Sequence, residues 1–416
     1  MNPSTLAGNA ALIARMNRSS ILRLVKEQGP ISRTQVAAQL KLNPATVGRV
    51  VSQLLKKDLL IEIGEEPLKE NSRGGRRALL LEYNHKAGYV IGLHLDAYNL
   101  LGVLADLGGD LVRIVELPPS PTRNRDENLD RVCSIVSELL QAEAHIGDSV
   151  RGLGIAVSSV VVNPEGIVTN SADLGWRDMP LKSLLQQRFG FPVFVQNECN
   201  LGALAETLWG AGRGASDLVW LSMGPGIGSG IIVDGRIRQG AHHAAGELAF
   251  MLPGLQYLGE TYARFGCMEP LCSCSAMVVK ARCAVEVGDL GLLKARLEQS
   301  GVLEVADVFD AARADDPLAL SLVRELVDYT SLIIVNIATV LDPDLIVLSR
   351  DLASAGDLLI PRIEARVRGV CPAQPRILTS ELKEEAIIRG AVALALQAAE
   401  DQFYVSTADL GEVLVM

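Results

Sequence analysis

The first pattern along the chain is a pair of short amphipathic stretches near the N-terminus. Ile21, Leu24 and Val25 recur at the spacing of one helical face, and a Gly-Pro pair at 29–30 predicts the end of that helix. Ser32 then supplies a side chain that can cap a second helix. The apolar stripe of this second helix consists of Val36, Ala37 and Leu40. The pattern therefore predicts two consecutive helices.

A third helix is predicted after Asn43-Pro44. Asparagine favours the N-cap position, and proline suits the first helical position, where its missing N–H costs nothing. One face of this helix carries the apolar residues Val47, Val50, Val51, Leu54 and Leu55. The opposite face carries small or hydrogen-bonding residues, which are Ala45, Thr46, Arg49, Ser52, Gln53 and Lys56. Such a face suits a helix that lies in the major groove of DNA.

Two apolar runs at 59–63 and 78–82 predict a pair of strands, joined by a long polar tip at 64–77. The tip contains arginines around paired glycines, so it can approach phosphates or a narrow minor groove closely. We interpret residues 17–85 as a winged helix-turn-helix; a three-helix protein-interaction module is the alternative. The candidate DNA-binding residues are Arg33, Ala45, Thr46, Arg49, Gln53, Arg73, Arg76 and Arg77.

The charge of the chain is unevenly distributed. Residues 1–86 contain 14 Lys and Arg against 7 Asp and Glu, whereas the rest contains 25 against 42. An acidic body with a basic N-terminal segment indicates that only this segment meets a polyanion. A solvated basic surface would explain the charge alone, but the helix-turn-helix pattern favours DNA.

The composition excludes a disordered or fibrous chain, since 49% of the 416 residues are hydrophobic and 21% are charged. The length predicts two or three domains. We find no signal peptide and no apolar run long enough to span a membrane. The seven cysteines are odd in number and mostly scattered, which suits a reducing compartment. We therefore expect a cytoplasmic protein with no membrane partner.

The acidic body alternates strand and helix patterns in two similar halves. The first half has predicted strands at 89–95, 100–105, 111–117 and 152–162. The second has predicted strands at 218–223, 230–233, 236–238 and 345–348. Three strands, a helical stretch and a further strand in each half are typical of the actin-like ATPase superfamily. The predicted fold class is α/β, with a two-lobed body after the winged helix-turn-helix.

Five motifs in consistent order carry a family resemblance. They are RGGRRA at 73–78, QNECNLGALAE at 196–206, GPGIGSG at 224–230, GAHHAAGE at 240–247 and GCME at 266–269. From about residue 17 to 400 the chain resembles the ROK family (repressors, open reading frames, kinases), and its repressor branch in particular. The resemblance implies these domains: a flexible tail 1–16, the winged helix-turn-helix 17–85, a first lobe 86–196, a second lobe with the C-terminal helix 197–400, and a tail 401–416.

The resemblance also shows what a kinase of this family would need. Its first phosphate loop is usually Asp-x-Gly-Gly-Thr, but residues 96–100 read Asp-Ala-Tyr-Asn-Leu, with both glycines lost. The second phosphate loop, 224–230, keeps its glycines. Because the first phosphate loop is lost, we interpret the second as a tight strand connection. The adenosine-side glycines are replaced at 349–351 by Ser-Arg-Asp. We therefore predict no catalytic residues and no cofactor.

The same comparison implies a sugar pocket. The Asn-Asp pair that carries the family's catalytic base is Asn197-Glu198 here, and the longer glutamate would misplace a general base. Glu247 and Glu269 match positions that contact the sugar ring. The expected effector-binding residues are therefore Asn197, Glu198, Glu247 and Glu269.

The family's zinc ligands are mostly replaced. Phe250 stands in place of the histidine, where it could stack on a sugar ring or close the pocket to ordinary hexoses. Glu260 and Tyr262 hold the two cysteine positions before Cys267. One ligand of four cannot hold structural zinc, so we predict no metal site. A relocated site at the Cys-x-Cys pair 272–274 stays open.

Three hypotheses follow. The first is a transcriptional regulator, a repressor of carbohydrate-utilisation genes, that binds palindromic operator DNA as a homodimer or higher oligomer and senses a small carbohydrate. The second is a sugar kinase with a DNA-binding arm, and the third is a regulator whose body docks a protein. The degenerate phosphate loops oppose the second hypothesis, and the retained pocket residues oppose the third.

Overall fold

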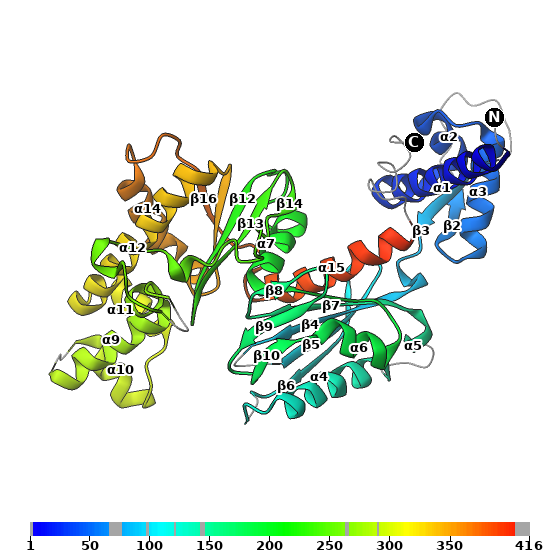
Figure 1. Cartoon of the computed structure of the whole chain (residues 1–416). Helices are drawn as coiled ribbons and strands as arrows, with labels where there is room; N and C mark the ends of the chain where they lie inside the picture. The colour runs from blue at the N-terminus through cyan, green and yellow to red at the C-terminus, as the bar shows by residue number, and fades with distance from the viewer. Residues whose placement is uncertain are drawn as a thin grey trace.

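The computed structural model describes residues 3–65, 77–96, 100–119, 122–141, 146–262, 266–288 and 291–403. Three parts are visible in Figure 1: an N-terminal unit, a first lobe beside it and a second lobe at the far side. Within the described ranges, no helix combines the length and apolar composition needed to cross a membrane.

The N-terminal unit is a winged helix-turn-helix. Its elements are α1 (Pro3–Gln28), β1 (Ile31–Ser32), α2 (Arg33–Leu40), α3 (Pro44–Lys56), β2 (Leu60–Glu65) and β3 (Leu79–Tyr83). The predicted caps are confirmed: Ser32 forms a capping box with Gln35, and the Asn43 side chain accepts a hydrogen bond from the Ala45 N–H at 2.8 Å. The two predicted strands pair antiparallel, and β1 joins them in the sheet order β1-β3-β2.

The expected flexible tail at residues 1–16 is a wrong prediction for residues 3–16, because α1 begins at Pro3. This segment is rich in alanine and leucine, which are strong helix formers. The first predicted helix therefore extends about five turns toward the N-terminus from Ile21.

The first lobe is built on a five-stranded sheet in the order β11-β7-β4-β5-β6. Its strands are β4 (Tyr89–Leu95), β5 (Leu100–Asp106), β6 (Leu111–Leu117), β7 (Val150–Val157) and β11 (Val193–Asn197). The smaller elements are η1 (His85–Ala87), α4 (Arg125–Leu140), α5 (Ile146–Ser149), β8 (Val161–Val162), β9 (Ile167–Ser171), β10 (Trp176–Met179) and α6 (Leu181–Phe189). The strand predicted at 152–162 is two strands, because the chain leaves the sheet after Val157 and pairs β8 with β9.

The second lobe repeats the plan with the order β14-β13-β12-β15-β16. Its strands are β12 (Leu218–Met223), β13 (Ile227–Val233), β14 (Arg236–Ile237), β15 (Leu345–Ser349) and β16 (Arg376–Thr379). Its helices are η2 (Leu248–Phe250), η3 (Leu255–Tyr257), α8 (Glu269–Cys272), α9 (Cys274–Val287), α10 (Leu292–Ser300), α11 (Val305–Arg313), α12 (Pro317–Leu341), α13 (Asp351–Ser354), α14 (Gly356–Val367) and η4 (Lys383–Glu385). In each sheet three antiparallel strands continue into two parallel ones, so the predicted duplication is confirmed.

Two helices lie at the junction of the lobes. These are α7 (Glu198–Trp209) and α15 (Ala386–Phe403), which pack against each other. A Cβ on Gly390 would lie 2.0 Å from the Leu201 carbonyl oxygen, so glycine permits their close approach. The C-terminal helix, which we assigned to the second lobe, packs on β4 and β7 of the first sheet. A Cβ on Gly154 would lie 2.0 Å from the Ala391 carbonyl oxygen, so glycine at this position allows α15 to pack directly on the sheet.

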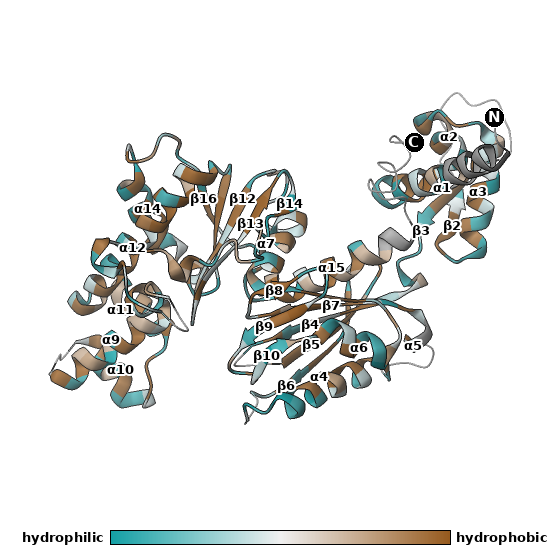
Figure 2. Ribbon diagram, viewed as in Figure 1, coloured by the Kyte–Doolittle hydropathy of each residue, from teal (hydrophilic) through white to brown (hydrophobic). Residues whose placement is uncertain are grey.

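The N-terminal unit shares a hydrophobic core with the first lobe. Ile21 and Tyr83 belong to one buried cluster with Val103 of β5 and with Ile388 and Leu396 of α15. In Figure 2 hydrophobic residues follow the strands of both sheets, whereas the outer surface of α4 is largely hydrophilic. The α15 helix therefore contacts α7 and also contributes to the core beneath the winged helix-turn-helix.

A buried carboxylate joins α7 to the second lobe. Glu206 is fully buried, and its Oε2 accepts a hydrogen bond from the Ala211 N–H at 2.7 Å. Its Oε1 accepts from the Leu382 N–H at 3.2 Å and from the Ser380 hydroxyl. Glu206→Ala leaves these buried donors without their partner, so we expect it to lower the free energy of unfolding by about 2–5 kcal/mol. Urea unfolding measures the loss through the tryptophan fluorescence of the chain, to which Trp209 on α7 contributes.

The matched variant is Glu206→Gln, which keeps one acceptor oxygen but turns an amide N–H₂ toward a donor. We expect Glu206→Gln to lower the free energy of unfolding by less than Glu206→Ala does. A loss below about 0.5 kcal/mol for the alanine variant, the range of an ordinary surface substitution, would contradict this role.

Candidate functional site

Side chains from both lobes meet at the Glu198 carboxylate. His94 Nε2 lies 2.9 Å from Glu198 Oε2, and Arg350 Nη2 lies 3.1 Å from the same oxygen. Parallel pairing explains the meeting within the first lobe, since Leu95 of β4 and Asn197 of β11 both lie beside Val157 of β7. The carboxyl ends of these strands therefore share one edge of the sheet. Arg350 arrives from the second lobe, where it follows β15.

Glu198 is held as an ionised carboxylate. Burial acts to raise its pKa, but the Arg350 guanidinium and the His94 hydrogen bond outweigh it and lower the pKa to about 2. Glu198 in turn raises the pKa of Arg350. A carboxylate with so low a pKa is a good hydrogen-bond acceptor and a weak general base.

Glu247 lies within electrostatic range of Glu198. It is half-buried at the start of η2, and burial together with the Glu198 charge raises its pKa. The structure thus brings together two of the four residues predicted to contact a sugar.

Asn197 acts as the N-cap of α7. Its Oδ1 accepts hydrogen bonds from the N–H groups of Cys199 at 2.8 Å and Asn200 at 3.2 Å. Its Nδ2 donates to the Ser159 carbonyl oxygen at 3.1 Å. These contacts place Glu198 at the first position of the helix, so Asn197 orients the carboxylate; a direct contact between Asn197 and a sugar stays a prediction.

Glu269 lies against the glycine-rich loop at 224–230. Its Oε1 accepts a hydrogen bond from the Ile227 N–H at 3.1 Å. The loop connects β12 and β13, which pair directly from Met223 and Ile227 onward. We predicted a strand connection for this loop. The Glu269 carboxylate accepts a hydrogen bond from one of the backbone amides at this connection. A sugar contact by Glu269 stays a prediction.

The face of α3 that we predicted to meet DNA is open to solvent. Ala45, Arg49 and Gln53 are exposed, and Thr46 is half-buried. The apolar face is turned inward, with Val47 and Val51 fully buried. The helix therefore presents the expected side chains outward.

Two of the predicted DNA-binding arginines have acidic partners. Arg33 Nη2 lies 2.7 Å from Glu62 Oε1 on β2, and Arg77 Nη1 lies 3.4 Å from Glu65 Oε2. These pairs are half-exposed or exposed, so they hold the arginines weakly. Arg73 and Arg76 lie outside the described residues.

Comparison with known sequences now decides the family. Residues 91–398 match the sequence model of the ROK family. The chain belongs to the ROK family. Residues 15–61 match the model of the MarR family, which covers the helix-turn-helix part of the N-terminal unit.

This ROK protein is similar to repressors over nearly its whole length. It is 28% identical over 395 residues to a putative xylose repressor of Caldicellulosiruptor sp. (strain Rt8B.4), with 94% of this chain and 97% of that protein covered. Its fold matches the crystal structure of a ROK family transcriptional regulator, a homolog of the E. coli MLC protein, with a TM-score of 0.79 and 26% identity; 94% of this chain and 98% of the other are covered.

The body of the ROK protein is also similar to a kinase. A ROK family glucokinase from Streptomyces griseus, in complex with glucose and AMPPNP, matches with a TM-score of 0.65 and 25% identity; 74% of this chain and 100% of the kinase are covered. The family and the fold are thus shared with both repressors and kinases, and local features of the site must distinguish these two functions.

Arg350 follows directly after β15 and has an unusual backbone conformation. Its backbone has φ +49° and ψ −129°, a conformation that favours glycine and is strained for arginine. Its Cδ would lie 3.4 Å from a Cβ on Gly224, so the side chain fills space beside the glycine-rich loop. We predicted bulky residues at 349–351 but missed the pairing of Arg350 with Glu198. The signal was a charged residue where glycine is expected.

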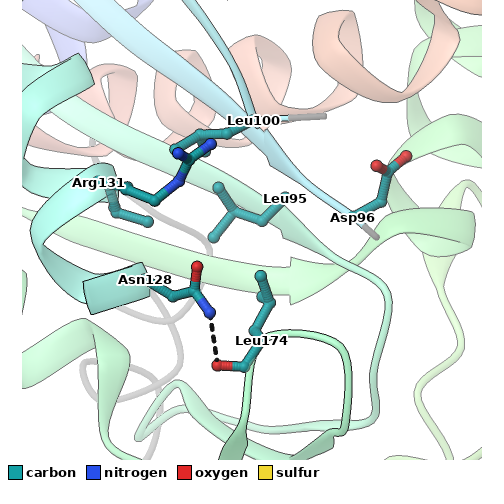
Figure 3. A pocket seen from close by; sticks show the side chains of 7 residues that line it. Leu95, Asp96, Leu100, Asn128, Arg131 and Leu174 are labelled. Carbon is teal, nitrogen blue, oxygen red and sulfur yellow. Dashed lines mark hydrogen bonds between the residues drawn. The ribbon is translucent and has the colours of Figure 1, made fainter. Parts of the chain in front are cut away.

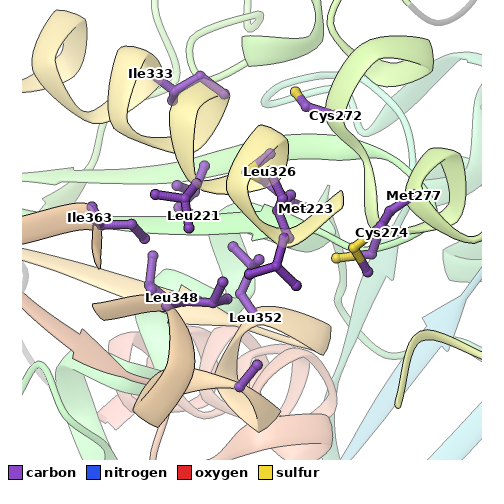
Figure 4. Close-up of a cluster of buried hydrophobic side chains, with 14 of the residues drawn as sticks. Leu221, Met223, Cys272, Cys274, Met277, Leu326, Ile333, Leu348, Leu352 and Ile363 are labelled. Atoms are coloured by element: carbon purple, nitrogen blue, oxygen red, sulfur yellow. The ribbon is translucent and has the colours of Figure 1, made fainter. Parts of the chain in front are cut away.

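The Cys-x-Cys pair of the second lobe lies in an apolar environment. Cys272 and Cys274 belong to its hydrophobic core, and Figure 4 draws them among leucine and methionine side chains. Burial raises the pKa of Cys272 to about 12 and that of Cys274 well above its usual value. A zinc ligand must be a thiolate, so this environment opposes the relocated site that we left open.

Two other residues of the zinc region, Cys267 and Tyr262, are accounted for by packing. Cys267 Sγ donates to the Met251 carbonyl oxygen at 2.9 Å, and Tyr262 packs against the same core. Phe250 is 49% exposed. Among the described residues, one group has acidic and imidazole atoms close enough for a metal ion, and it is His94, Asp96 and Glu198. The Arg350 cation bound to Glu198 opposes a metal ion there.

A small pocket lies in the first lobe beside this group. It is lined by Leu95, Asp96, Leu100, Asn128, Arg131, Val132 and Leu174. Figure 3 shows the Asp96 side chain apart from the others, and Asn128 Nδ2 donates to the Leu174 carbonyl oxygen at 3.0 Å. The pocket and the Glu198 group share Asp96, but the pocket contains none of the four residues predicted to bind a sugar.

Proposed function

We propose that this ROK protein is a sugar-responsive DNA-binding transcriptional repressor. One observation carries the proposal: a winged helix-turn-helix and a ROK body occur in one chain, aligned over nearly the full length of a putative xylose repressor. The exposed face of α3 would read the major groove, and the basic wing would contact phosphates or the minor groove.

The sugar would bind at Glu198 and Glu247. An ionised Glu198 offers acceptor oxygens to hydroxyl groups, and Glu247 lies within its electrostatic range. Asn197 would orient Glu198. Glu269, which lies against the glycine-rich loop, would line the opposite side of the sugar site.

The operator would be palindromic and the protein a homodimer or higher oligomer. Two recognition helices of a symmetric dimer lie about one DNA turn, roughly 34 Å, apart. The packing of α7 against α15, and of α15 into the core under the winged helix-turn-helix, offers a route from the pocket to DNA. The sugar acts by binding one arrangement of the two DNA-binding units more tightly than the other.

The test begins with selection of genomic fragments that the full-length protein binds. Operator affinity is then measured by fluorescence anisotropy with and without D-xylose, D-glucose and N-acetylglucosamine. We expect selective binding to a palindromic site and a change in affinity with at least one sugar. Equal binding to all fragments would contradict the repressor proposal.

The competing function is a sugar kinase with a DNA-binding arm. We predict no sugar-dependent formation of ADP above background, because Glu198 is a weak base with a pKa of about 2 and the Arg350 side chain lies beside the glycine-rich loop. A coupled ADP assay with magnesium, ATP and the same sugars checks this prediction. Sugar-dependent turnover that Glu198→Ala abolishes would establish the kinase instead.

A further inference from the structure

The side chain of Glu198 connects the two lobes. His94, near the end of β4, lies 2.9 Å from Glu198 Oε2, and the Ser158 side chain, directly after β7, also forms a hydrogen bond with this carboxylate. Both of these partners belong to the first lobe. Arg350 belongs to the second lobe, and its Nη2 lies 3.1 Å from the same oxygen, Oε2. We call the Arg350–Glu198 contact the inter-lobe ion pair.

The start of α7, where Glu198 lies, is tied to the first lobe. Glu198 follows β11 directly, and Asn197 before it donates from Nδ2 to the Ser159 carbonyl oxygen at 3.1 Å. The inter-lobe ion pair is shielded from water, since the side chains of Arg350 and Glu198 are only 22% and 13% exposed. Salt therefore screens it weakly. Of the three partners of Glu198 named above, Arg350 is the one that a movement between the lobes would withdraw.

The hydroxyl groups of a sugar would compete with Arg350 for Glu198. An ionised carboxylate has about four sites that accept hydrogen bonds, and His94, Ser158 and Arg350 engage three of them. A sugar that donates two hydroxyl hydrogens to Glu198 must therefore displace one of these donors. His94 and Ser158 lie on the same edge of the first sheet as Glu198, whereas Arg350 is carried by the other lobe. Arg350 is thus the donor that can leave with the least rearrangement.

A displaced Arg350 keeps a second acidic neighbour. The Glu198 charge is the largest cause of the raised pKa of Arg350, and the Asp351 charge acts in the same direction. Asp351 follows Arg350 in the second lobe, so the two residues stay together when the lobes move. Breaking a buried ion pair is costly when a charge is left without compensation. The attraction of Asp351 for the guanidinium reduces this cost.

We propose that the inter-lobe ion pair is the conformational switch of this protein: Arg350 holds the lobes in the arrangement of this structure, and a sugar that binds Glu198 displaces it. The inference rests on the proposed sugar-sensing function and assigns its regulation to one residue. The sugar would bind more tightly to the arrangement in which the pair is broken, and so would shift the equilibrium toward it. By the same linkage, a variant without the pair binds the sugar more tightly, since none of the binding energy is used to break it.

Arg350→Gly tests the inference in the full-length protein. The backbone at Arg350 has φ +49° and ψ −129°, which suits glycine, so the variant removes the guanidinium and the strain together. Isothermal titration calorimetry gives its affinity for D-xylose, D-glucose and N-acetylglucosamine, and fluorescence anisotropy gives its affinity for the operator. We expect it to bind the sugar to which the parent responds at least about fivefold more tightly, the lower end of usual couplings between sites. Without sugar, its operator affinity should lie within about twofold of the parent's value in saturating sugar.

Two further variants separate the switch from general effects on the fold. Arg350→Lys keeps the positive charge on a shorter side chain, and we expect the same two changes at smaller size. Arg366→Ala is the matched control, because it removes an ion pair of 2.8 Å with Asp328 that lies within the second lobe, between α14 and α12. We expect the control to keep the parent's sugar affinity and operator affinity. Circular dichroism during heating checks that each variant is folded.

The outcomes distinguish the inference from the proposed function. If the parent responds to a sugar but folded Arg350→Gly binds that sugar no more tightly, or keeps the parent's sugar-free operator affinity, the ion pair is not the switch and the sugar-responsive repressor stands. If Arg350→Gly does not fold, the same two measurements on Arg350→Lys decide. Equal changes in Arg366→Ala also overturn the inference, because they would not depend on the contact between the lobes. A parent whose operator affinity no sugar changes overturns the proposed sensor and the inference with it.

Discussion

Arg49→Ala is expected to relax the sequence preference of operator binding by roughly 5- to 150-fold at the base pair that Arg49 contacts. Arg49 is exposed on the outward face of α3, where a guanidinium can form two hydrogen bonds to a guanine edge. One such contact contributes about 1–3 kcal/mol of discrimination against the wrong base. Affinity for the operator and for single-base variants, measured by fluorescence anisotropy, checks the prediction.

Arg77→Ala is the matched variant on the wing. Arg77 pairs with Glu65 at 3.4 Å in an exposed position, so phosphate can compete for its guanidinium. We expect this variant to weaken binding to all sequences alike and to reduce the dependence of affinity on salt by about one phosphate contact. If Arg49→Ala also weakens all sequences equally, α3 does not read bases through this residue.

Local elements could be predicted from the sequence because their signals are local. Ser32 and Asn43 are capping residues directly before helical patterns, and both caps form. The repeated strand pattern predicted two similar halves, and the two sheets have the same order of strands. In both cases the signal lies in neighbouring residues, although the order of the strands also depends on pairing between distant segments.

The long-range packing could not be predicted in this way. The α15 helix is apolar over most of its surface, so its pattern does not show which sheet it covers. Its packing on the first sheet requires Gly154 and its packing on α7 requires Gly390, and these two glycines lie far apart in the sequence. The predicted boundary of the second lobe was wrong at this helix for the same reason.

The contacts around Glu198 were only partly predicted. Glu198 and Glu247 act on each other electrostatically, but the partners that hold Glu198 in place are His94 and Arg350. Arg350 is 152 residues away along the chain. It follows β15, which pairs with β12, and α7 packs against β12. Asn197 was interpreted through the family resemblance, although its position before a helix also fits a cap.

Glu247→Ala is expected to remove the response of operator binding to sugar while leaving affinity for DNA unchanged in the absence of sugar. Glu247 lies in the second lobe near Glu198, and it contributes no side chain to the winged helix-turn-helix. Couplings between sites are typically about 5- to 150-fold in affinity, and we expect less than a twofold effect of sugar in this variant. Operator affinity with and without the sugar measures both quantities.

Glu247→Gln adds a test through pH. Burial and the Glu198 charge raise the pKa of Glu247 in the folded protein, so this carboxyl stabilises the fold at acidic pH and loses that contribution as pH rises through the raised pKa. The neutral glutamine should therefore raise the unfolding midpoint at pH 7 by roughly 2–4 °C, with a smaller difference at pH 4. If Glu247→Ala keeps the full sugar response, the sensor lies elsewhere in the body. If Glu247→Gln instead lowers the unfolding midpoint at pH 7 relative to the parent, burial and the Glu198 charge do not destabilise the ionised Glu247.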